Sequence, residues 1–90
     1  MLNFSKNILD QKNKLIIDYL ENKLTKTQIN YFVEFLMVGE EGLAYETLCE
    51  QIDEKDINIS RDFFETLKQQ CILYGIENEY FEGLKHLIVD

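Results

Sequence analysis

Several residue types are scarce or missing in this chain of 90 residues. It has no Pro and no Trp, and only four Gly, two Cys and one His. Pro removes a helix hydrogen bond and clashes with the preceding turn, so its absence favours uninterrupted helices. Two Cys and one His are too few for a disulfide framework or for a four-ligand structural zinc site.

Long apolar runs are missing as well. Stretches without charge, such as residues 35–38, are far shorter than a membrane span, and the first ten residues lack the apolar run of a signal peptide. We therefore expect a cytoplasmic protein that does not associate with a membrane. In that compartment the thiols of Cys49 and Cys71 should stay reduced.

The composition is that of a folded domain. Apolar residues make up 46% of the chain and aromatic residues 12%, which is too much for a disordered tail. The length indicates a single domain over residues 1–90. Apolar residues recur at helical spacing in five segments, which predicts an all-α bundle of about five short helices. These segments cover approximately residues 6–22, 26–38, 42–54, 61–74 and 78–88.

Local signals mark the ends of these helices. Thr25 followed three residues later by Gln28 is a capping-box pattern, and Ser60 is a favourable N-cap. Gly39 and Gly75 stand where a left-handed residue ends a helix. Residues 56–60 alternate polar and apolar side chains. We interpret them as an extended connector whose Ile57 and Ile59 enter the core, because a lone strand would have no partner.

The segment 26–38 is apolar on more than one face. Besides its main stripe it carries Tyr31, Phe35 and Val38 at positions i, i+4 and i+7. A helix that is apolar nearly all round is either central in the core or buried against another chain. Tyr31, Phe35 and Val38 are therefore a candidate homodimer or partner face.

The net charge of -8 is concentrated in one part of the chain. Residues 40–56 carry seven acids against Lys55 alone, whereas residues 1–38 carry a net charge of +1 and residues 57–90 a net charge of -3. An acidic chain is poorly suited to bind a phosphate backbone directly. It remains well suited to bind a basic protein.

Helical spacing aligns most of these acids. Glu46, Glu50, Asp53 and Glu54 share one stripe, and Asp56 follows close behind. Like charges at i and i+4 destabilise a helix, and anions are disfavoured near its C-terminus. The stripe is either a solvated face that keeps the protein soluble, or a surface that presents carboxylates to a basic cleft.

Patterns typical of an enzyme, a metal site or a cofactor site are not found. His86 has no nucleophile beside it in the sequence, and Cys49 and Cys71 fall on apolar stripes, where Cys acts as a small hydrophobe. The acids of residues 53–56 do not fit a calcium loop with its central Gly. We expect no catalytic residue, no cofactor and no bound metal.

One stretch of the chain resembles a known family. Residues 39–52, GEEGLAYETLCEQI, are followed by DINIS at 56–60, by Phe63, Phe64 and Leu67, and by Gly75. This pattern is similar to that of the Maf-type immunity proteins, small bacterial proteins encoded beside polymorphic toxins. It covers about half of the chain, residues 39–75, and contains no catalytic signature.

The resemblance implies that the chain neutralises the C-terminal domain of a cognate secreted toxin, often a nuclease. Because nuclease active sites are basic, our hypothesis is that a line of carboxylates meets Lys or Arg of the toxin, with Tyr45 or Tyr31 as an aromatic anchor. Those carboxylates are Glu46, Glu50, Asp53, Glu54 and Asp56.

Two other classes of function stay open. The chain could be a structural or regulatory homodimer that uses the Tyr31, Phe35 and Val38 face. It could also be an acidic nucleic-acid mimic that inhibits a DNA-binding protein. A mimic should inhibit several unrelated basic proteins, whereas an immunity protein should accept only its own toxin.

Overall fold

The computed structural model describes residues 10–89, and within them it confirms the all-α class. Five α-helices account for most of this part of the chain, together with one 3-10 turn and two strands of two residues each. The elements are α1 (Gln11–Leu20), α2 (Lys26–Met37), α3 (Glu41–Glu54), β1 (Ile59–Ser60), α4 (Arg61–Leu73), α5 (Asn78–Glu82), η1 (Lys85–Leu87) and β2 (Ile88–Val89). The part of the first predicted helix that covers residues 6–9 lies outside the described residues.

Helices α2 and α4 begin and end where the sequence signals predict. The Thr25 Oγ1 accepts the Gln28 N–H at 3.1 Å while the Gln28 Oε1 accepts the Thr25 N–H at 3.0 Å, which confirms the capping box. The Ser60 Oγ accepts the Phe63 N–H at 3.1 Å at the start of α4. Gly39 and Gly75 follow α2 and α4 with φ angles of 78° and 73°, which an L side chain adopts only with strain.

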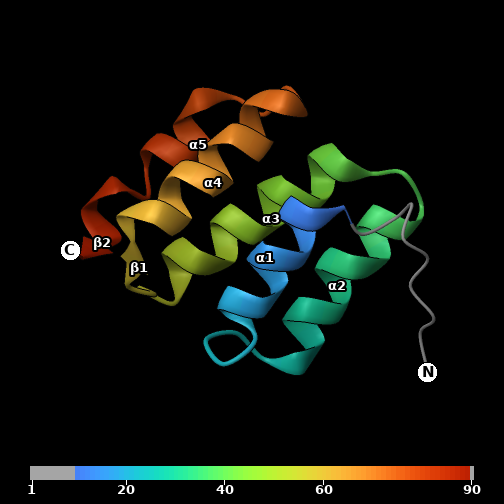
Figure 1. Cartoon of the computed structure of the whole chain (residues 1–90), viewed down its shortest axis with the longest axis horizontal. Coiled ribbons are helices and arrows are strands. Elements are labelled where there is room, and N and C mark those ends of the chain that lie inside the picture. Colours follow the sequence, from blue (N-terminus) through green and yellow to red (C-terminus); the bar gives the residue numbers. More distant parts are fainter. Residues whose placement is uncertain (1–9, 90) are drawn as a thin grey trace.

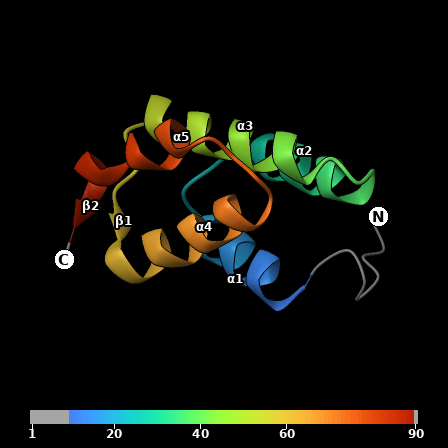
Figure 2. The same ribbon diagram turned by 90° about the horizontal axis from the view of Figure 1, so that it is seen from above.

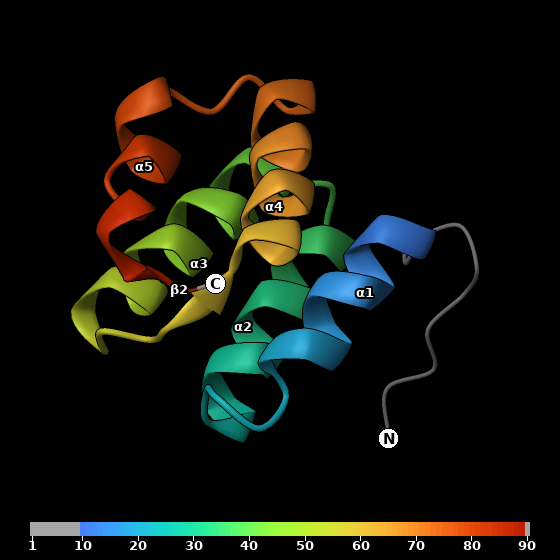
Figure 3. The same ribbon diagram turned by 60° about the vertical axis from the view of Figure 1, so that its left-hand side comes forward.

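The helices form two layers (Figures 1 and 2). Helices α2, α3 and α5 lie in one layer, and α1 and α4 lie in the other (Figure 2). Helix α2 packs closely along α3, and α1 packs on α4. Helix α5 lies against α3 and α4, on the side of the molecule away from α1 and α2 (Figure 3).

A single hydrophobic cluster joins residues from all five helices and from the connector before α4. Ile57 and Ile59 are buried in it, as the sequence predicts. The predicted stripe of α3 is buried along its whole length: Tyr45, Leu48, Cys49 and Ile52 are each at most 1% exposed. The apolar periodicity of the sequence therefore identifies the buried side of α3 correctly, whereas Leu15, which falls on the apolar stripe of the first helix, is 54% exposed.

The structure corrects two predictions about the C-terminal half. Ile59 and Ser60 are a strand, because Ile88 and Val89 pair with them in parallel, Ile59 opposite Ile88 and Ser60 opposite Val89. The fifth helix does not continue to residue 88. It ends at Glu82, and the chain then turns through Gly83 and η1 into β2. The apolar stripe of that segment still packs inward, since Phe81, Leu84 and Leu87 are buried.

Candidate protein-binding surface

The predicted carboxylates of α3 lie on the side of the helix that faces away from the core. Glu50, Asp53 and Glu54 are exposed and Glu46 is half-buried. Asp56 is also exposed and sits in the turn after the helix, with a φ of 49°. All five side chains are therefore placed where a partner can reach them.

Helix α5 extends this acidic stripe across a shallow hollow of about 280 Å³. Glu50 and Asp53 line it from α3, and Glu79 and Tyr80 line it from α5. Cys49 and Gly83 complete its lining. Three carboxylates and one phenol ring thus surround a space that is suited to an ammonium or guanidinium group.

The phenol of Tyr80 reflects the electrostatic field of this region. Its pKa is raised above the ordinary value, first by the charge of Glu46, then by desolvation, and further by Glu50, Glu77 and Glu79. A raised phenol pKa means that another negative charge is disfavoured there. We call the seven carboxylates that make this region negative the acidic surface: Glu46, Glu50, Asp53, Glu54, Asp56, Glu77 and Glu79.

Basic residues lie beside the acidic surface. Lys55 is exposed between Glu54 and Asp56, and Lys85 and His86 follow α5. The Nε2 of His86 lies 3.6 Å from Asp53 Oδ1, with both side chains more than half exposed. Lys85 pairs with Glu82 at 2.5 Å, and this contact lowers the pKa of the Glu82 carboxyl. Neither Lys85 nor His86 lines the hollow between α3 and α5.

Tyr45 does not belong to this surface, so its prediction as a surface anchor is wrong. Its side chain has no exposed area, and its Oη donates a hydrogen bond to Asn13 Oδ1 in the core. Gln70 Nε2 donates to the same Asn13 oxygen at 3.2 Å and to Tyr45 Oη at 3.3 Å. The Tyr45 ring also stacks on Tyr74, with centroids 5.6 Å apart. This packing occupies every side of the residue.

The candidate dimer face on α2 is only partly exposed. Tyr31 is 52% exposed and Val38 is 71% exposed, whereas Phe35 between them is half-buried and packs against the core. Tyr31 is accordingly the one of the two proposed anchor tyrosines that a partner can contact directly.

The two thiols lie together in the core. The Sγ atoms of Cys49 and Cys71 are 3.9 Å apart and both residues are buried. The contact with Cys71 and the surrounding burial raise the pKa of Cys49, which disfavours the reactive thiolate.

Among residues 10–89, no group of three His, Cys, Asp or Glu side chains is arranged to hold a metal ion. Within the same range, no helix is long and apolar enough to cross a membrane.

Sequence reasoning missed the contribution of α5, namely Glu77, Glu79 and Tyr80. Their charge is visible in the sequence, because residues 57–90 carry a net charge of -3. Nothing in their spacing indicates that they lie beside Glu50 and Asp53, since that proximity depends on how α5 packs on α3.

Searches of protein-family models, curated proteins and solved structures return no match to this chain. The function must therefore be argued from the surface itself and from the pattern of residues 39–75.

Proposed function

We propose that this protein is an immunity protein that binds and neutralises the basic C-terminal domain of a cognate bacterial toxin. The observation that carries the proposal is the acidic surface, on which carboxylates from α3 and α5 converge around one hollow. The proposed activity is binding without catalysis, and the proposed partner is a nuclease domain.

The acidic surface has the chemistry that such a partner requires. A nuclease holds the phosphates of its substrate with Lys and Arg, so its active site is a basic cleft. Fixed carboxylates opposite that cleft accelerate encounter and favour the correct partner. The ring of Tyr80, half-buried at the hollow, can also attract a cation to its face. Tyr80 thus takes the anchor role that we first assigned to Tyr45.

The residues that carry the resemblance to Maf-type immunity proteins have two separate places in the fold. Most of the apolar ones are buried and build the frame: Ala44, Leu48, Ile52, Ile57, Ile59, Phe63, Phe64 and Leu67. Leu43 is exposed, as is the acidic Glu50, while Glu41 and Glu46 are half-buried. This division is what an immunity protein needs, because its frame supports a surface that recognises the toxin.

The decisive experiment is co-expression with the C-terminal domain of the protein encoded immediately upstream, which the proposal expects to be the toxin. We expect the protein to restore growth and to co-purify with that domain. If the protein neither restored growth nor formed a complex with that domain, the proposal would be contradicted. A stable complex that inhibits several unrelated basic nucleases equally would favour the nucleic-acid mimic instead.

Charge reversal tests whether the acidic surface makes the contact. We expect Asp53→Lys/Glu54→Lys to weaken toxin binding roughly tenfold or more, mostly through slower association, because charge complementarity acts on the encounter step. Surface plasmon resonance would give both rate constants.

The matched control is Glu34→Lys/Glu65→Lys, which changes the net charge equally at exposed positions on α2 and α4. If both double variants lower the association rate by the same factor, only net charge matters, and the acidic surface is not the binding site.

A further inference from the structure

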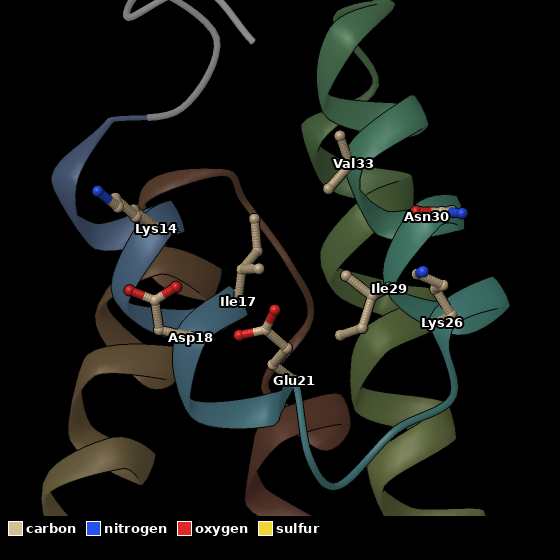
Figure 4. A pocket seen from close by; sticks show the side chains of 8 residues that line it. All are labelled: Lys14, Ile17, Asp18, Glu21, Lys26, Ile29, Asn30 and Val33. Carbon is tan, nitrogen blue, oxygen red and sulfur yellow. The ribbon is translucent and has the colours of Figure 1, made fainter. Parts of the chain in front are cut away.

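A second concave feature, separate from the hollow between α3 and α5, lies between α1 and α2. These helices are consecutive in the chain, yet α2 packs mainly on α3 and α1 mainly on α4. A groove of about 440 Å³ remains between them (Figure 4). It shares no lining residue with the hollow between α3 and α5.

The groove is apolar in the middle. Ile17 projects into it from α1, and Ile29 and Val33 project into it from α2 (Figure 4). Ile17 and Ile29 are only half-buried, so the chain leaves part of their apolar surface in water. Covering such surface is favourable in proportion to the area removed from water.

Charged residues stand on both walls. Lys14, Asp18 and Glu21 belong to the α1 wall, and Lys26 belongs to the α2 wall across the gap from Glu21 (Figure 4). Within the described residues, none of these four side chains forms an ion pair. The groove therefore combines an apolar centre with the facing charges of Glu21 and Lys26, which have no ion-pair partner among residues 10–89.

We propose that a second copy of this chain covers this groove in a two-fold symmetric dimer. A two-fold axis that runs along the groove places the α1 wall of one copy opposite the α2 wall of the other. Ile17 then meets Ile29 of the second copy, and Glu21 meets Lys26 of the second copy, twice in each dimer. The two α1–α2 pairs form a four-helix arrangement around a shared apolar centre.

This interface differs from the face expected from the sequence. Tyr31, Phe35 and Val38 do not line the groove. The hollow between α3 and α5 shares no lining residue with the groove, and α5 lies on the side of the molecule away from α1 and α2 (Figure 3). The inference therefore does not depend on the proposed function.

The test uses two charge reversals and their mixture. Lys26→Glu and Glu21→Lys should each weaken the dimer roughly tenfold, because each places like charges opposite one another at two symmetric contacts. An equal mixture of the two variants should restore it, since every contact in the mixed dimer again joins opposite charges. Sedimentation equilibrium would measure the dissociation constants.

Both substitutions suit the fold of the single chain. Lys26 is the first residue of α2, where an acid is favoured by the helix dipole, and Glu21 follows α1, where a base is favoured. Circular dichroism should therefore show folded variants. Glu65→Lys and Lys55→Glu, exposed and outside the groove, are the matched controls and should leave the dimer unchanged.

Three results would overturn the proposal. One is a wild-type protein that stays monomeric at about 100 µM, a concentration that reveals even a weak dimer. Another is a mixture of Lys26→Glu and Glu21→Lys that associates no better than either variant alone. The third is Ile29→Asp abolishing toxin binding without changing the oligomeric state, which would assign the groove to the toxin.

Discussion

At the scale of single residues, the buried hydrogen bonds among Asn13, Tyr45 and Gln70 are the most specific feature of the core. The three side chains come from α1, α3 and α4, and each is at most 2% exposed. A buried polar group is costly unless it is hydrogen-bonded, so these bonds fix how the three helices are positioned relative to one another.

Tyr45→Phe should reveal that role. It removes the hydroxyl and leaves the other two buried polar groups with fewer partners, which costs about 1–3 kcal/mol of stability. Urea denaturation of the variant would measure the loss. Tyr31→Phe, at a position that is 52% exposed, should change stability by less than about 0.5 kcal/mol. Equal effects of the two substitutions would contradict this account.

At the scale of elements, α2, α3 and α4 are predictable because each carries its own apolar stripe, and α2 and α4 also carry clear end signals. The pairing of β1 with β2 is not predictable in this way. It joins Ile59 to Ile88, which are far apart in the sequence, and neither segment alone forms a stable strand. The fifth helix is mispredicted because its apolar spacing is satisfied equally well by a short helix, a turn at Gly83 and a 3-10 turn.

The acidic surface, like the fold, was predictable only within single helices. The α3 carboxylates share one helix, so their alignment follows from helical spacing alone. The addition of Glu79 and Tyr80 depends on the docking of α5 against α3, which single-sequence patterns do not encode. Tyr45 was misassigned because an aromatic residue on an apolar stripe can either be buried in the core or anchor a partner, and the spacing is the same in both cases.

Replacing Gly by Ala should have opposite effects on stability at Gly75, which follows a helix, and at Gly42, which lies within one. Gly75 has a φ of 73°, so Gly75→Ala should destabilise the protein by about 1 kcal/mol, although a Cβ there would meet no atom within 4 Å. Gly42 lies in α3 without such a φ, and a Cβ there would sit 3.9 Å from Ile76 Cδ1, an ordinary contact. Gly42→Ala should therefore stabilise the protein by about 0.5 kcal/mol.

Thermal unfolding would compare the two variants with the wild type, since about 1 kcal/mol shifts the Tm of a domain of this size by roughly 4–8 °C. If Gly75→Ala were neutral or stabilising, the left-handed conformation at the end of α4 would not be required.

At the scale of the whole molecule, one continuous core should make the five helices of residues 10–89 unfold together. The cluster includes residues of every α-helix, so a change at one buried group should appear in global stability. The protonation state of Tyr45 should affect global stability in this way, because burial raises the pKa of its phenol well above the ordinary value near 10.

Stability should therefore fall at alkaline pH. Above pH 10 the unfolded chain releases the Tyr45 proton while the folded chain retains it, so the folded state is favoured less as pH rises. The slope from this one group is about 1.4 kcal/mol per pH unit, and its contribution is fully present below pH 10. Urea denaturation at several pH values above 9 would measure it. Tyr45→Phe should lack this part of the slope, and an unchanged slope would disprove the assignment.

The adjacent thiols of Cys49 and Cys71 give the molecule an internal reporter of its own opening. They are shielded in the folded state, so an alkylating reagent can react with them only in the fraction of molecules whose core is transiently exposed. The rate of alkylation then measures that fraction at very low protein concentration. Any ligand that binds only the folded chain will slow the labelling, so its affinity can be determined without attaching a tag to the protein.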